Sequence, residues 1–140
     1  MIFDPNDPQG AHAIERLKTE QVGWLTTVTP EGQPQSFPVW FVSDGSEILI
    51  YNDHRAKRNR NLEANPRLSF HLGDDEGADI VSIEGMAEPA PDAPAAGENA
   101  AYWAKYHEPI DRYLGGAAKF SHRYSNPIRI RVTRAVATPG

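Results

Sequence analysis

The chain has 140 residues, of which 39% are hydrophobic and 24% charged, and its formal net charge is −5. These values predict one soluble globular domain over residues 1–140, while the acidic balance argues against general nucleic-acid binding and the absence of cysteine excludes disulfides and thiolate metal sites. No apolar run approaches the roughly 20 residues that cross a bilayer, and the start lacks a signal-peptide pattern, so we expect a cytoplasmic protein.

The first half of the chain predicts a helix and then three strands. Residues 7–20 carry apolar side chains at helical spacing. Three segments rich in aromatic and β-branched residues follow, separated by short turns, at residues 23–29, 34–42 and 47–52. Because the turns are short, we expect these strands to form an antiparallel meander.

The second half predicts a short helix, two strands, a helical region and a closing strand. The short helix covers residues 57–65 and stops before Pro66, because a residue that precedes proline is disfavoured in the helical conformation. The two strands cover residues 67–72 and 79–89, with Gly85 as a bulge or a point of close approach. A helix within residues 91–107, a helical turn at 109–114 and a strand at 126–138 complete the chain.

Six strands joined mostly by tight turns, with few helices, are typical of a small closed antiparallel barrel. The predicted fold class is therefore mainly β, with a six-stranded antiparallel barrel and a few short helices.

Residues 54–62, HRAKRNRNL, concentrate positive charge in this acidic protein. Their four cationic side chains are Arg55, Lys57, Arg58 and Arg60, and no acidic residue lies among them. The segment sits where a strand meets the start of a helix, a position that favours an anion. A solvated helix face is the simpler alternative, but the forked donors of arginine suit phosphate or carboxylate oxygens. We therefore expect a site for a small anion, with Leu62 anchoring the helix to the core.

A proline interrupts an otherwise strong strand in SFPVWF, residues 36–41. Pro38 cannot donate to a sheet, so the strand lies at an edge or is broken there, which exposes the main chain near Trp40. Flat heterocycles use such main-chain groups. An ordinary edge strand with Val39 and Phe41 in the core is the alternative.

Four stretches together resemble the split-barrel flavin and deazaflavin oxidoreductases, which are relatives of pyridoxamine 5′-phosphate oxidase, and within them the branch that uses the deazaflavin coenzyme F420. They are FDPNDP, IERLKTEQVGWLTTVTPEGQPQSFPVWFV, RNLEANPRLSFHL and KFSHRYSNPIRIRVTR, at residues 3–8, 14–42, 60–72 and 119–134. The resemblance implies a split barrel that forms a homodimer, with one cofactor in each of two clefts at the subunit interface.

The resemblance also implies the cofactor site. A K-x-R-N-L-like motif after the third strand holds the cofactor phosphate in such proteins, and either Arg58 or Lys57 takes the place of its lysine here. The strand from residue 36 to 40 would line the deazaflavin ring through its backbone, with residues 26–28 beneath it. The expected cofactor-binding residues are Arg55, Lys57, Arg58, Arg60, Asn61, Ser36, Pro38, Val39 and Trp40.

The coenzyme F420 carries an anionic phospholactyl–oligoglutamate tail, which a longer positive path would suit. The cationic C-terminal segment could supply this path from the second subunit, through Lys119, Arg123 and Arg129; solvated strand residues are the alternative. Four aromatic residues are candidates to cover the substrate pocket: Trp40, Tyr102, Trp103 and Tyr106. Ordinary packing is the simpler role for each of them.

The function implied is transfer of a hydride from the reduced deazaflavin to an electron-poor acceptor, such as an enone, a quinone or a related heterocycle. We assign no general acid. No histidine lies at a metal-ligand spacing from another histidine or an acidic residue, so we expect no metal site. His54 and His122 would lie near the cofactor. There are three alternatives. The first is an FMN-dependent oxidase or reductase of the same fold, and the second is a non-catalytic F420 carrier. The third and weakest is an anion- or nucleic-acid-binding module.

Overall fold

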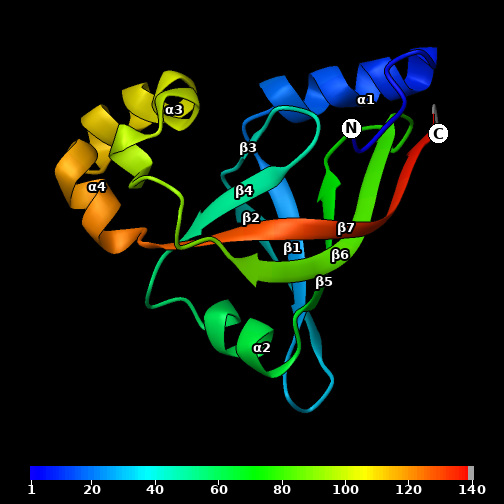
Figure 1. Ribbon diagram of the computed structural model, residues 1–140. Coiled ribbons are helices and arrows are strands. Elements are labelled where there is room, and N and C mark those ends of the chain that lie inside the picture. Colours follow the sequence, from blue (N-terminus) through cyan, green and yellow to red (C-terminus); the bar gives the residue numbers. More distant parts are fainter. Residues whose placement is uncertain (139–140) are drawn as a thin grey trace.

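The computed structural model describes residues 1–138 and contains one curled sheet with helices around it (Figure 1). The helices are α1 (Pro8–Thr19), α2 (Arg58–Ala64), α3 (Ala100–Tyr113) and α4 (Ala117–Arg123), with a short 3-10 turn, η1 (Ala96–Glu98). The strands are β1 (Gly23–Val28), β2 (Pro34–Val39), β3 (Val42–Ser43), β4 (Ile48–Asn52), β5 (Arg67–Leu72), β6 (Ile80–Pro89) and β7 (Asn126–Thr138). None of the helices in this part of the chain is long and apolar enough to span a membrane.

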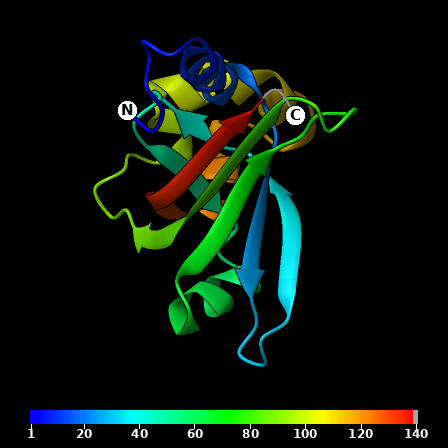
Figure 2. The ribbon, with the colours of Figure 1, turned by 90° about the vertical axis from the view of Figure 1, so that its right-hand side faces the viewer.

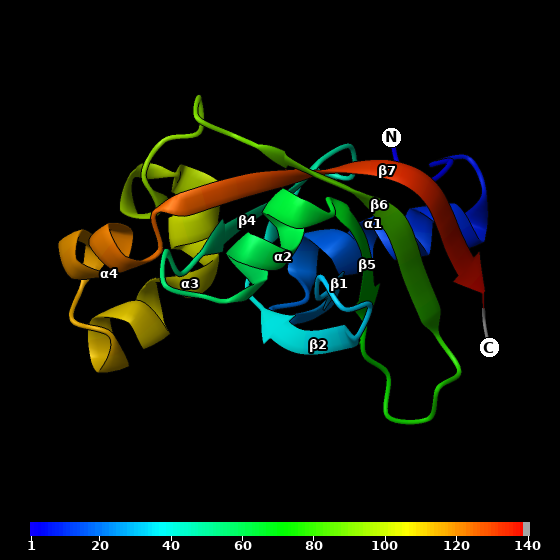
Figure 3. The ribbon, with the colours of Figure 1, turned by 90° about the horizontal axis from the view of Figure 1, so that it is seen from below.

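The sheet is antiparallel throughout and its strand order is β2-β1-β5-β6-β7-β4-β3. Its two edges, β2 and β3, are separated in the chain only by Trp40 and Phe41. Three peptide steps reach at most about 11 Å, whereas a flat sheet of this many strands is roughly 29 Å wide. The sheet therefore has to curl until its edges approach each other, which gives the half-barrel seen from the side and from below (Figures 2 and 3).

The predicted mainly β, antiparallel split-barrel class is confirmed, but the sheet has seven strands instead of six. The predicted strand at 34–42 divides into β2 and β3. Both antiparallel hairpins of the predicted meander are present, β1–β2 and β3–β4. The break at Trp40 and Phe41, however, puts the second hairpin at the opposite end of the sheet from β2, where β4 also pairs with β7. β2 is an edge strand, as the proline at position 38 required.

The strand divides because α3 takes over the main-chain hydrogen bonds of Phe41. The Tyr106 hydroxyl accepts a hydrogen bond from the Phe41 N–H at 2.9 Å, and the Lys105 ammonium donates to the Phe41 carbonyl at 2.8 Å. The Tyr106 hydroxyl also lies 2.6 Å from the Gln21 carbonyl, to which it donates. A buried peptide group needs partners, and here side chains of one helix supply them in place of a neighbouring strand.

The main core lies inside the curl of the sheet. Leu68, Phe70 and Leu72 of β5 point into it, as their alternation predicted, and so do Ile128 and Ile130 of β7. α1 closes the upper end of the curl (Figure 1) with Ala13 and Leu17, and α2 is anchored by the buried Leu62, as predicted. A second, mainly aromatic cluster joins β4 to the inserted helices through Tyr51, Ala96, Tyr102, Tyr106, Ile110 and Phe120.

Gly85 marks a β-bulge in the long β6–β7 ribbon, as predicted. The register between the two strands shifts between Glu84 and Gly85. A Cβ atom at position 85 would lie 2.6 Å from the Arg131 carbonyl oxygen, so the close approach of the two backbones requires glycine. The bulge increases the local bend of the ribbon and so contributes to the curl.

The helical region between β6 and β7 differs from its prediction. The expected helix and the separate turn at 109–114 form one helix, α3, which continues through Pro109. Its buried face repeats every four residues, at Tyr102, Tyr106 and Ile110, and this packing outweighs the missing N–H of proline. α4 was not predicted, because its sequence AAKFSHR offers only one buried residue, Phe120.

We expect Tyr106→Phe to destabilise the fold, because the buried N–H of Phe41 then loses its acceptor. The free energy of unfolding should fall by about 1–3 kcal/mol. The control is Tyr113→Phe, since Tyr113 is 74% exposed and its change should stay within about 0.5 kcal/mol. Urea denaturation of both variants measures the difference, and equal stabilities would show that the hydrogen bond to Phe41 does not hold the strand break.

Candidate functional site

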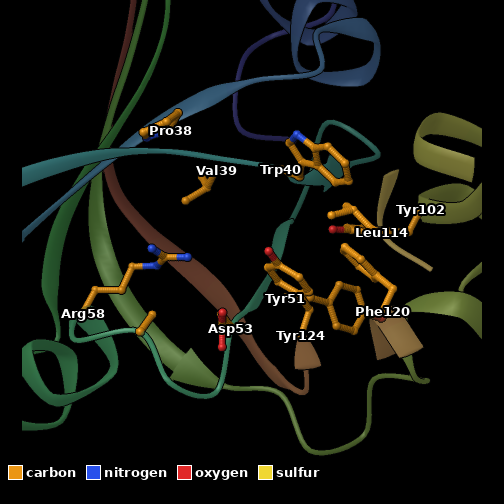
Figure 4. Close-up of a pocket in the computed structure, with 11 residues that line it drawn as sticks. Pro38, Val39, Trp40, Tyr51, Asp53, Arg58, Tyr102, Leu114, Phe120 and Tyr124 are labelled. Atoms are coloured by element: carbon orange, nitrogen blue, oxygen red, sulfur yellow. The ribbon is translucent and has the colours of Figure 1, made fainter. Parts of the chain in front are cut away.

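A cavity of about 310 Å³ lies between the end of β2, the start of α2 and the inserted helices (Figure 4). We call it the aromatic cavity. Arg58 reaches into it from one side, and aromatic residues stand on the other (Figure 4). Its lining residues are Pro38, Val39, Trp40, Tyr51, Asp53, Ala56, Arg58, Tyr102, Leu114, Phe120 and Tyr124.

Arg58 brings a partly buried positive charge to this cavity. Its Nε donates to the Oδ1 atom of Asn52 at 2.7 Å. No carboxylate of residues 1–138 lies within ion-pair distance of its guanidinium. Burial lowers the pKa of Arg58 below the usual guanidinium value, and the nearby negative charge of Asp53 offsets this only in part. A buried charge without a counter-ion is costly, so the cavity is electrostatically suited to an anion.

The aromatic wall is held by ring stacking. The indole of Trp40 lies 4.5 Å from the Tyr106 ring with an interplanar angle of 3°, and Phe120 stacks on Tyr124 at 4.3 Å. Tyr102 contacts Tyr51 edge-on at 4.9 Å. Of the predicted roof residues, Trp40 and Tyr102 line the cavity and Tyr106 is buried behind Trp40. The fourth, Trp103, packs against the aromatic cluster outside the lining.

A second, more open cavity of about 710 Å³ adjoins the first. We call it the basic pocket. It shares the residues Leu114, Phe120 and Tyr124 with the aromatic cavity, so these side chains separate the two spaces. The nitrogen-bearing side chains of its lining come from two segments, the loop after β4 and helix α4: His54, Arg55, Lys119, His122 and Arg123.

Asp53 stands between the two spaces and partly neutralises the basic residues. Its carboxylate lies 2.8 Å from the Arg123 Nε and 3.6 Å from the Arg55 Nε. Burial alone would raise the pKa of Asp53, but the Arg55 N–H and the Arg123 guanidinium hold it below its ordinary value. The sequence segment 54–62 contains no acid, yet the residue directly before it supplies one. Asp53 therefore remains a carboxylate at neutral pH.

The structure separates the other predicted site residues. Asn61 is buried and its Nδ2 donates to the Thr27 hydroxyl at 3.1 Å, so it ties α2 to β1. The Ser36 hydroxyl lies 2.6 Å from the Thr26 hydroxyl, on the exposed side of β2. Two further predicted cations are exposed on or beside α2, outside the lining of both spaces: Lys57 and Arg60.

The residues of the predicted positive path lie in two different places within one chain, and their contribution from a second subunit stays a prediction. Lys119 and Arg123 lie in the basic pocket, where Arg55 joins them. Arg129 lies elsewhere: it is paired with Asp92 at 2.7 Å and with Glu47 at 3.4 Å, so its charge is already compensated. Lys119 and Arg123 therefore share the basic pocket, and Arg129 lies outside it.

Sequence reasoning named Lys119, His122 and Arg123 of α4 but missed Asn52, Asp53 and Phe120. Asn52 and Asp53 end a strand and resemble ordinary turn residues, so only their contacts with Arg58 and Arg123 reveal them. The alternation within KFSHRY, residues 119–124, mixes aromatic and basic side chains. This pattern was a usable signal, because it places both walls of the basic pocket in one short segment.

Residues 11–135 match the sequence profile of the pyridoxamine 5′-phosphate oxidase family. A conserved hypothetical protein of Mycobacterium tuberculosis is 26% identical and has a TM-score of 0.72, over 92% of this chain and 83% of that one. A solved structure named F420 reductase is 26% identical, with a TM-score of 0.61 over 87% of this chain and 94% of that one. General Stress Protein 26 of Bacillus anthracis is 20% identical and shares the fold, with a TM-score of 0.65 over 92% and 94% of the chains.

No curated protein sequence is similar enough to match. The family match, however, covers nearly all of the described residues, and the curled antiparallel sheet agrees with it. This chain therefore belongs to the pyridoxamine 5′-phosphate oxidase family, a family of split-barrel oxidoreductases that bind flavin-type cofactors.

Proposed function

We propose that this chain is an F420-dependent reductase, which passes a hydride from the reduced deazaflavin to an electron-poor acceptor such as an enone, a quinone or a related heterocycle. Two findings support a deazaflavin over FMN. The chain is 26% identical to an F420 reductase across 87% of its length. The basic pocket beside the aromatic cavity also suits a coenzyme with a long anionic tail better than one that ends at a single phosphate.

The observation that carries the proposal is that Arg58, at the wall of the aromatic cavity, has a charge that no ion pair compensates. The guanidinium is partly buried, and its ion-pair partner is missing among residues 1–138. A phosphate group would supply that partner, with charge-assisted hydrogen bonds to the fork of the guanidinium. The residues present thus fit a coenzyme that combines a flat ring with a phosphate.

The rest of the cavity suits the ring and the acceptor. Pro38, Val39 and Trp40 line the cavity at the end of β2, an edge strand with no neighbour beyond it, where main-chain groups can bind a heterocycle. Stacking on Tyr106 fixes the Trp40 indole as one wall of the acceptor site. When bound, the reduced coenzyme supplies the hydride. Asp53 stays ionised and is held by Arg123, so we assign the accompanying proton to solvent.

The proposal includes a homodimer. Phe37 lies on the same face of the sheet as its register partner Leu25, which is 1% exposed, yet Phe37 itself is 46% exposed. The curl leaves this part of the inner face open at the β2 edge. A second copy of the chain that covers Phe37 would bury this surface.

The proposal is tested by measuring which coenzyme binds and whether it turns over. We expect Kd for F420 to be at least about 10-fold lower than Kd for FMN, and reduced F420 to be consumed only when an acceptor such as menadione is present. Tighter FMN binding would favour the FMN-dependent alternative of the same fold. Tight F420 binding without consumption under any acceptor would indicate a carrier protein.

Replacing Arg58 decides which cation serves the phosphate. Arg58→Met removes the charge that faces the cavity, and we expect coenzyme affinity to fall by roughly 30-fold, about 2 kcal/mol. The matched control is its neighbour, Lys57→Met, which removes an exposed charge and should change Kd less than about 3-fold. Fluorescence titration measures both. The reverse ranking would assign the phosphate to Lys57 and overturn the placement made here.

The basic pocket should serve the tail and not the ring. In the double variant Arg55→Glu/Lys119→Glu the pocket becomes acidic, so F420 with its full oligoglutamate tail should bind about 10-fold more weakly. A tail-trimmed form of the coenzyme should lose much less. The double variant Arg131→Glu/Arg134→Glu, on β7 and outside the pocket, controls for the same change in net charge. Equal losses for both forms of the coenzyme would refute the tail path.

A further inference from the structure

Asn52 is the residue on which Arg58 rests. It is the last residue of β4, it is 0% exposed, and its Oδ1 atom accepts the Nε–H of Arg58 at 2.7 Å. The surrounding loop is fixed by two further asparagine contacts. The Asn126 Nδ2 donates to the Asn59 Oδ1 at 2.8 Å, and the Asn59 Nδ2 donates to the Asp53 carbonyl at 2.9 Å.

Only the oxygen of the Asn52 side-chain amide forms a hydrogen bond. The amide Nδ2 is the one buried side-chain nitrogen or oxygen atom in residues 1–138 that has no hydrogen-bond partner. The opposite orientation of the amide would bring two donors, Nδ2 and the Arg58 Nε–H, face to face. The contact with Arg58 therefore fixes the amide, although this leaves a buried N–H group unsatisfied, which costs stability. Such a cost at a candidate site points to a functional constraint.

We propose that Asn52 is a positioning residue, which fixes the Arg58 guanidinium at the wall of the aromatic cavity through a neutral acceptor and so keeps its charge available to an anionic ligand. An amide and a carboxylate have nearly the same shape. An aspartate at this position would hold the Nε–H equally well, but it would also neutralise the guanidinium. The inference rests on the proposed function only in taking the ligand's anion to be a coenzyme phosphate; the anion site itself is open to test with inorganic phosphate.

The decisive variant is therefore Asn52→Asp, which keeps the hydrogen bond and removes the uncompensated charge. Two probes follow binding: inorganic phosphate, monitored by the NMR signal of the Arg58 Nε–H, and whichever of F420 and FMN binds the unaltered protein more tightly. We expect Kd for both probes to rise about 10-fold or more, while the midpoint of thermal unfolding falls by less than about 2 °C. Asn65→Asp makes the same chemical change at the end of α2, outside the cavity lining, and should leave both affinities unchanged.

A variant that lacks Arg58 tests whether Asn52 positions Arg58 or only packs in the core. In Arg58→Met, the further change Asn52→Ala should have no additional effect on the Kd of the coenzyme, because the guanidinium that Asn52 positions is gone. Should Asn52→Asp fail to fold, Asn52→Ala provides the test: the Arg58 Nε–H signal should lose its protection from exchange and Kd should rise, with no change in net charge.

The results that overturn the inference are distinct from those that overturn the coenzyme. Unchanged affinity in Asn52→Asp, an equal loss of coenzyme affinity from Asn52→Ala with and without Arg58, or a loss of affinity that merely follows a loss of stability would assign Asn52 to packing alone. Absence of any phosphate-induced shift of the Arg58 signal would remove the anion site itself. A clear preference for FMN with the expected effects of Asn52→Asp would reject F420 and still support Asn52.

Discussion

The arrangement of this protein depends on the two-residue connection between the edges of its sheet. Trp40 and Phe41 join β2 to β3, so the sheet has to curl, and the main chain of Phe41 leaves the sheet to bind Tyr106 and Lys105 of α3. The same connection brings Trp40 out of the strand and onto the ring of Tyr106. The closure of the barrel and the position of a cavity wall thus follow from one local departure from strand geometry.

The second organising feature is how charge is distributed around Asp53. This carboxylate binds Arg123 and Arg55 but does not contact Arg58, which is held instead by a neutral amide. The basic pocket is in consequence partly neutralised, whereas the partly buried cation of the aromatic cavity, Arg58, forms no ion pair and feels Asp53 only at longer range. A phosphate and an extended carboxylate chain would meet different environments in these two spaces.

Much of the fold was predictable because hydrophobic alternation is strong where strands face the core, as in RLSFHL (residues 67–72), where the buried positions are Leu68, Phe70 and Leu72. The errors came from contacts that lie far apart in the sequence. The sequence around Phe41 does not indicate that Tyr106 binds its backbone, so the pattern of residues 34–42 predicts one strand. Pro109 likewise predicts a helix boundary, because a proline leaves the carbonyl four residues earlier, that of Lys105, without its usual donor. In the structure the Gln21 side-chain amide lies 3.5 Å from that carbonyl and donates to it.

The site was predictable to the level of the segment but not of the side chain. Charge density identified residues 55–60, and the proline identified the edge near Trp40, yet only one of the clustered cations faces the aromatic cavity. The choice between Arg58 and Lys57 depends on which of two neighbouring helix positions points inward. The role of Asn61, which binds Thr27 in the interior, depends on how α2 docks on β1. Neither is encoded in local sequence pattern.

The segment from Ala90 to Ser125 adds no strand to the sheet, yet it supplies the residues that divide the two spaces: Leu114, Phe120 and Tyr124. Its helices rest on the aromatic cluster around Tyr51 and largely outside the hydrogen-bonded ladder. Sequence changes within this segment can therefore reshape the partition between the two spaces while the strands of the barrel stay as they are. Substitutions in this segment can thus alter the shape of both spaces without altering the sheet.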